Sequence, residues 1–169
     1  MGEKWGSKLS VLEGFGVLAG LSIWAEEVAR RGAVKLMCDN LGFVYAFRKG
    51  HSKDIYIYTL AKAVHDIGLG LGAQVRIFHT GRRTSVGDKV VDHLSKYEME
   101  AVHQLVPNML DVRDQLPRIL GDWINKPRPC QDLGRKALVE LSGRFPVKLD
   151  RDYRTDMDVL LKKGRLAHL

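Results

Sequence analysis

The stretch Val34–Asn40 reads VKLMCDN. A short, mostly apolar run leads directly into a carboxylate, which is followed by an amide. The apolar part is typical of a buried strand, so Asp39 is expected where that strand leaves the sheet. An aspartate at such a point either caps the next helix or takes part in chemistry, and this stretch alone leaves both alternatives open.

The segments around this stretch predict alternating helices and strands. Ser10-Val-Leu-Glu13 has the form of a capping box, and the apolar spacing after it predicts one helix from about Leu9 to Arg31. Three glycines in that helix either weaken it or permit close packing against a sheet. Further elements are expected in this order: a helix over 40–48, a helix over 54–68, a strand over Gln74–His79 and a helix over 88–96. This order predicts an α/β layer with parallel strands.

The amino-acid composition of the chain changes after Tyr97. All five prolines lie beyond this point. Two short helical patterns, an FPVKLD segment and a polar helix are expected over 116–125, 132–142, 145–150 and 152–163. We therefore predict a core over 1–97 and a mainly helical C-terminal extension over 98–169.

Composition narrows the class of protein. Hydrophobic residues make up 45% of the chain and charged residues 28%, as in globular proteins. The longest apolar run, Val17–Trp24, is too short to span a bilayer and follows no signal-peptide pattern, so no membrane partner is expected. Cys38 and Cys130 form no CxxC pair, which argues against a zinc site or a disulfide scaffold. They favour a reducing, cytoplasmic or nuclear location.

The net charge of +7 lies mainly in the first part of the chain. Residues 1–97 carry 14 Lys and Arg against 9 Asp and Glu. This excess indicates a polyanionic partner, and the alternative is a basic protein without one.

Three carboxylates stand in informative places. Glu13 lies in the first turn of an expected helix, Asp39 ends a strand, and Asp92 lies in the helix after the second strand. The predicted topology allows them to converge at one end of a sheet. Carboxylates brought together repel one another, and Mg²⁺ or Mn²⁺ relieves that repulsion through hard oxygen ligands.

Four pieces of sequence carry a resemblance to a known family. They are SVLEGFGVLAGL at 10–21, LMCDN at 36–40, FRKGHS at 47–52 and FHTGRRTSVGDKVVDHLSK at 78–96. In this order they resemble the ribonuclease H domain attached to reverse transcriptases of DIRS and gypsy-type retroelements. The resemblance covers roughly residues 10–96 and implies a ribonuclease H-like fold.

The resemblance also implies an activity and a site. Glu13, Asp39 and Asp92 correspond to ligands of Mg²⁺ or Mn²⁺, and His79 corresponds to the family's histidine after the last strand. In such enzymes two metal ions hold the scissile phosphate of RNA in an RNA–DNA hybrid, activate water and stabilise the leaving oxygen. Phosphate contacts that position the hybrid without reading its sequence are expected from Arg48, Lys49, Lys53, Arg82 and Arg83.

The sequence departs from the family at its front. The family's fold opens with three antiparallel strands, the first of which carries another catalytic aspartate, whereas about twelve residues precede Glu13 here. We therefore expect an N-terminally truncated fold, from a larger polyprotein or from a decayed or repurposed relative. The edge of the Val34–Cys38 strand would then need a cover. A second copy, an upstream polyprotein segment and the FPVKL segment are the candidates.

Simpler interpretations stand beside these. Glu13 can be a capping-box residue, Asp39 a helix cap and Asp92 a solvated helix residue. The histidines lack metal-ligand spacing, and Phe15 and Trp24 have the spacing of core residues. At the level of function, the alternative is a non-catalytic ribonuclease H-like module that binds nucleic acid or a protein partner.

Overall fold

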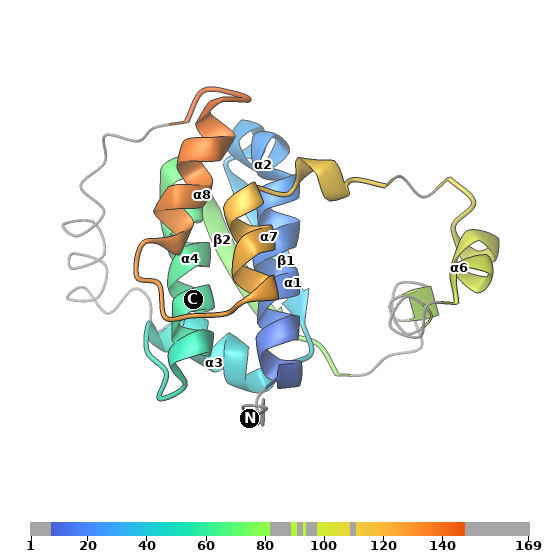
Figure 1. Cartoon of the computed structure of the whole chain (residues 1–169), viewed down its shortest axis with the longest axis horizontal. Coiled ribbons are helices and arrows are strands. Elements are labelled where there is room, and N and C mark those ends of the chain that lie inside the picture. The colour runs from blue at the N-terminus through green and yellow to red at the C-terminus, as the bar shows by residue number, and fades with distance from the viewer. Residues whose placement is uncertain (1–7, 82–88, 91–92, 94–97, 109–110, 148–169) are drawn as a thin grey trace.

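The computed structural model describes residues 8–81, 89–90, 93, 98–108 and 111–147. Its helices and strands are coloured along the chain in Figure 1. In chain order they are α1 (Lys8–Ile23), α2 (Ala25–Arg31), β1 (Ala33–Cys38), α3 (Leu41–Lys49), α4 (Ile55–Leu71), β2 (Gln74–His79), α6 (Met99–Leu105), a 3₁₀ turn (Arg113–Gln115), α7 (Arg118–Asn125) and α8 (Leu133–Ser142).

Strands β1 and β2 form a parallel pair. Their register runs from Ala33 opposite Gln74 to Cys38 opposite His79, with α3 and α4 as the connection. Parallel strands require such a crossover, because the chain must return to the same end of the sheet. The predicted α/β class and the parallel pairing are therefore confirmed, for a sheet that has two strands within the described residues.

The helix predicted over 9–31 is in fact two helices. The chain bends by 68° between α1 and α2, with Trp24 at the break. Ser22 Oγ donates to the Leu18 carbonyl oxygen at 2.8 Å, a back-bond that commonly bends a helix. Trp24 is 61% exposed at this corner, so its assignment to the core was wrong. No single helix among the described residues is long and apolar enough to span a membrane.

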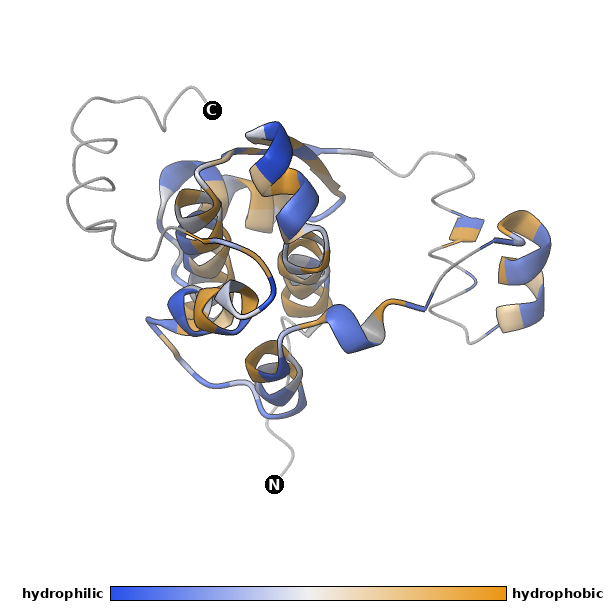
Figure 2. Ribbon diagram, turned by 90° about the horizontal axis from the view of Figure 1, so that it is seen from above, coloured by the Kyte–Doolittle hydropathy of each residue, from blue (hydrophilic) through white to orange (hydrophobic). Residues whose placement is uncertain are grey.

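The elements stack in three layers (Figures 1 and 2). Helices α1, α3 and α4 cover one face of the sheet, and α7 and α8 pack on the other side of α1 and α4. Along each strand, burial alternates because successive side chains point to opposite faces. Leu36 and Ile77 therefore point toward the helices, whereas Lys35, Met37 and Arg76 point to the open face.

Helices α7 and α8 of the predicted extension share the core of the strands. Leu120, Leu133 and Leu138 are buried in the same cluster as Leu18 and Leu60. Among the described residues, every buried hydrophobic side chain except Val102 belongs to this cluster. Helix α6 lies apart from it in both views.

The FPVKL segment does not join the sheet as far as it is described. Phe145 and Val147 instead pack against the helical core. The rest of that segment and the polar helix expected over 152–163 lie outside the described residues.

A glycine sets how closely α1 approaches its neighbours. A Cβ on Gly14 would lie 2.6 Å from the Phe43 ring and 3.3 Å from Leu60, whereas a Cβ on Gly16 would meet nothing within 4 Å. Gly14 therefore permits close packing, against α3 and α4 rather than against the sheet.

Candidate functional site

The candidate site lies at the carboxyl ends of the two parallel strands. The Thr80 amide donates to the Cys38 carbonyl oxygen at 3.0 Å, so the strand pairing continues to the last residue of β1. Asp39 follows immediately and is exposed. In open α/β sheets this end is where ligands bind, because loops and helix N-termini meet there.

Asn40 joins three elements at this point. Its Oδ1 accepts from the Phe43 amide at 2.8 Å, and Asn40 is the N-cap of α3. Its Nδ2 donates to Ser10 Oγ at 2.7 Å and to Glu13 Oε2 at 2.8 Å. The interpretation of Asp39 as a helix cap was wrong, because Asn40 has that role.

Glu13 is a partly buried residue within α1. The helix already includes Lys8, so Ser10 is not its N-cap, and the capping-box interpretation of Glu13 was also wrong. The Glu13 carboxylate instead faces Asn40, 27 residues further along the chain.

The buried Cys38 thiol ends β1, just before Asp39. Burial is the main cause that raises the pKa of Cys38, against a weak hydrogen bond to the Asn40 carbonyl oxygen. The negative charges of Asp39 and Glu13 raise this pKa further. Both cysteines are free thiols.

The donor set at this end suits a hard divalent cation. Glu13 Oε2 accepts from Asn40, and among the described residues nothing hydrogen-bonds to Glu13 Oε1 or to the Asp39 carboxylate. Two carboxylates with free oxygens are what Mg²⁺ and Mn²⁺ bind. No group of three His, Cys, Asp or Glu side chains that could hold a metal occurs in the described part of the chain. Asp92, the third predicted ligand, lies outside it.

His79 ends β2 beside this site. It pairs in register with Cys38 and is exposed. In a parallel pair, residues opposite one another point to the same face, so His79 projects from the side of the sheet that carries the helices.

The predicted phosphate-binding residues fall into different surroundings. Arg48 is half-buried and donates through Nη2 to the Ile77 carbonyl oxygen at 3.3 Å, with its Nε buried and unpaired. The backbone N–H and C=O groups of even-numbered residues of β2 bond to β1. The Ile77 carbonyl oxygen therefore points to the outer edge of β2. Lys49 lies 5.6 Å from the centre of the exposed Tyr45 ring, and Lys53 is exposed before α4. Arg82 and Arg83 lie outside the described residues.

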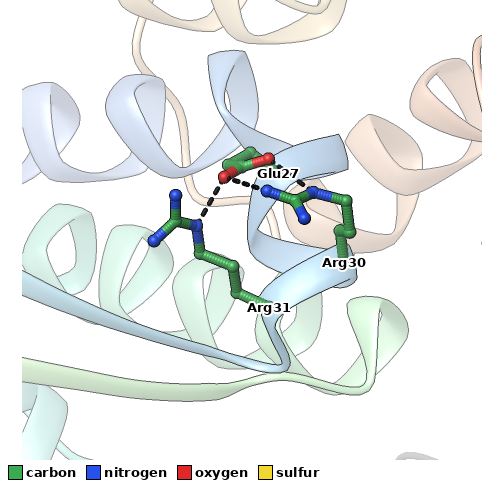
Figure 3. Close-up of polar contacts among 3 residues, drawn as sticks. All are labelled: Glu27, Arg30 and Arg31. Atoms are coloured by element: carbon green, nitrogen blue, oxygen red, sulfur yellow. Dashed lines mark hydrogen bonds and ion pairs between the residues drawn. The ribbon is translucent and has the colours of Figure 1, made fainter.

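A second basic cluster, Arg30 and Arg31 on α2, is partly neutralised by one carboxylate. Glu27 pairs with Arg30 at 2.7 Å and with Arg31, as Figure 3 shows. Hydrogen bonds from Arg30 and then Arg31 lower the pKa of Glu27 from 4.5 to about 2. These guanidinium groups are therefore poor candidates for free phosphate contacts.

Two features escaped the sequence reasoning. The first is Asn40, which the sequence patterns marked only as the residue after Asp39, because its partners Ser10 and Glu13 lie 30 and 27 residues away. The open sheet face also carries Lys35, whose Nζ lies 4.8 Å from the centre of the Phe78 ring. Alternation in VKLMC and QVRIF places Lys35 and Arg76 on one face.

Comparison with known proteins identified no relative of this chain. No protein-family model, curated protein or solved structure matches the chain.

Proposed function

We propose that the chain is a ribonuclease H-like domain that hydrolyses RNA in RNA–DNA hybrids with Mg²⁺ or Mn²⁺. The observation that supports this most directly is the meeting of Glu13 with Asn40, next to Asp39, at the carboxyl end of β1. The helix residue and the strand-end residue of the resemblance thus lie at one corner of a parallel sheet.

In this proposal Glu13, Asp39 and Asp92 hold the cation. When bound, the metal would activate water and stabilise the charge on the departing oxygen. The partly buried Glu13 offers one oxygen that has no partner in the described part of the chain, and the exposed Asp39 is open to solvent and phosphate. His79, at the exposed end of β2, is the candidate group for proton exchange near the scissile bond.

The contacts divide the basic residues by role. Lys49 and Lys53 are exposed and suit phosphate contacts, together with Arg82 and Arg83 of the resemblance. Arg48 is already engaged by the Ile77 carbonyl oxygen, so its contribution is to hold β2 in place.

We further propose a strand partner at β1. The backbone N–H and C=O groups of odd-numbered residues of β1 point away from β2. The Met37 side chain, on the open face beside this edge, is 56% exposed. A second copy of the chain or an upstream polyprotein segment would pair with this edge, and the upstream segment would also supply the family's further aspartate. Sedimentation at several concentrations tests the first source, and co-expression with a reverse-transcriptase segment tests the second.

A cleavage assay tests the proposed activity. The chain, with and without such a segment, is incubated with a labelled RNA–DNA hybrid and Mn²⁺ or Mg²⁺. We expect metal-dependent cleavage that Asp39→Asn and Glu13→Gln reduce by more than about 100-fold, because outer-shell changes alone cost 10–100-fold. Asp54→Asn, at the N-cap of α4, is the matched control. Cleavage that survives Asp39→Asn contradicts the proposal.

The open sheet face favours a second candidate, a module that binds without cleaving. Lys35 and Arg76 project from this face beside Phe78. Such a module binds the hybrid at low salt, is unaffected by Asp39→Asn, and is weakened by Lys35→Glu with Arg76→Glu. Absence of both binding and cleavage would leave a globular chain without a nucleic-acid ligand.

A further inference from the structure

Asn40 uses its whole carboxamide. The oxygen accepts from the Phe43 amide at 2.8 Å, and the nitrogen donates to Ser10 at 2.7 Å and to Glu13 at 2.8 Å. The orientation of the group follows from chemistry. A backbone N–H requires the oxygen, and an ionised carboxylate requires the NH₂.

These bonds fix the Glu13 carboxylate relative to the backbone at the carboxyl end of β1. The carbonyl oxygen of Cys38 is held by Thr80, and Asn40 is held by the first turn of α3. Asp39 therefore lies between two anchored residues. The bond from Asn40 Nδ2 to Glu13 Oε2 then ties α1 to Asn40.

We propose that Asn40 is a positioning residue that holds the Glu13 carboxylate at the end of β1, where Asp39 follows the strand, and leaves Glu13 Oε1 without a partner among the described residues and so available to a cation. The role in cation binding rests on the proposed function, whereas the tether itself does not. Helix capping alone does not explain Asn40, because aspartate or serine caps α3 equally well but neither donates to Glu13 as a carboxamide does.

A double-mutant cycle tests the tether in the metal-free chain. Asn40→Asp keeps the cap oxygen but sets a second carboxylate against Glu13, so the urea midpoint is expected to fall. Adding Glu13→Gln to Asn40→Asp restores the hydrogen bond with donor and acceptor exchanged. The double variant is therefore expected to recover most of the lost urea midpoint. Asp54→Asn makes the reverse exchange at the N-cap of α4, away from Glu13, and is expected to change little. Losses that simply add would overturn the proposal.

Manganese binding tests the positioning role. Asn40→Ser preserves a cap, adds no charge and is too short to reach Glu13. We expect the dissociation constant for Mn²⁺, measured by electron paramagnetic resonance, to rise about tenfold in Asn40→Ser. Asp54→Ser, at the cap of α4, is expected to leave Mn²⁺ binding unchanged.

The two measurements separate the possible failures. A wild-type chain that binds Mn²⁺ no more tightly than Asn40→Ser overturns the positioning role. A wild-type chain that binds no Mn²⁺ counts against the proposed function. In that case the cycle alone decides whether Asn40 fixes Glu13, and non-additive stability supports it while additivity refutes it.

Discussion

Phe15 of α1 and Trp123 of α7 stack with ring centroids 6.3 Å apart and 10° between their planes. Phe15 lies two residues after Glu13, so this stack braces the helix that carries a candidate ligand. Trp123 is 4% exposed, and its Nε1 donates to the Arg128 carbonyl oxygen at 2.7 Å. The C-terminal helices therefore contribute to the site through α1.

Truncation of Trp123 tests this brace. Trp123→Ala is expected to lower the free energy of unfolding by about 3–5 kcal/mol, since it removes a buried ring and leaves a cavity. Trp123→Phe keeps a ring on Phe15, loses the hydrogen bond and is expected to cost less. Urea denaturation followed by far-UV circular dichroism gives both values. An equal loss in the two variants would show that stacking contributes nothing.

Two glycines of α1 form a matched pair. Gly14→Ala places a methyl group against the Phe43 ring, which is 0% exposed, and is expected to cost about 1–3 kcal/mol through overpacking. Gly16→Ala meets open space and is expected to stabilise the helix by up to about 1 kcal/mol. Thermal unfolding of the two variants measures opposite shifts, and shifts of the same sign would contradict the packing of α1.

Glu140 caps α7 from another helix. Its carboxylate accepts from the Arg118 amide at 2.7 Å and from the Ile119 amide at 2.9 Å, where Pro117 offers no side-chain cap. Glu140→Ala is expected to destabilise the fold by about 1–2 kcal/mol, because two N–H groups at a helix N-terminus lose an anionic partner. Glu140→Gln keeps one acceptor and should lose less. Urea titration distinguishes the three proteins.

The ion pairs of Glu27 predict a pH dependence. The pKa of Glu27 in the folded chain is lowered from 4.5 to about 2, so its stabilising contribution is complete above pH 4.5 and disappears as pH falls toward 2. Carboxyl ¹³C titration should return the low value. Arg30→Ala with Arg31→Ala should move the titration back toward 4.5. A wild-type titration near 4.5 would mean that the pairs do not persist in solution.

The sequence predicted the strands better than it predicted the side-chain partners. Both strands appear where the short stretches VKLMCD and QVRIFH indicated them, because the pattern of a strand lies in a few neighbouring residues. The break at Trp24 was missed because it depends on the Ser22 back-bond, and apolar spacing does not reveal such a bond. Likewise, Ser10 and Glu13 satisfied a capping pattern, yet their shared partner is a residue 27 or more positions away. Local patterns carry no information about which distant amide approaches a carboxylate.

Arg48 makes the two edges of the sheet unequal as sites for a further strand. Its guanidinium donates to the Ile77 carbonyl oxygen at the outer edge of β2. A further strand that paired there would have to displace this hydrogen bond. Within the described residues, the edge of β1 is therefore the more accessible side for a further strand. A carboxylate on a strand paired with β1 would arrive next to Asp39, on the flank opposite His79, which is the place where the proposed function calls for a further acidic ligand.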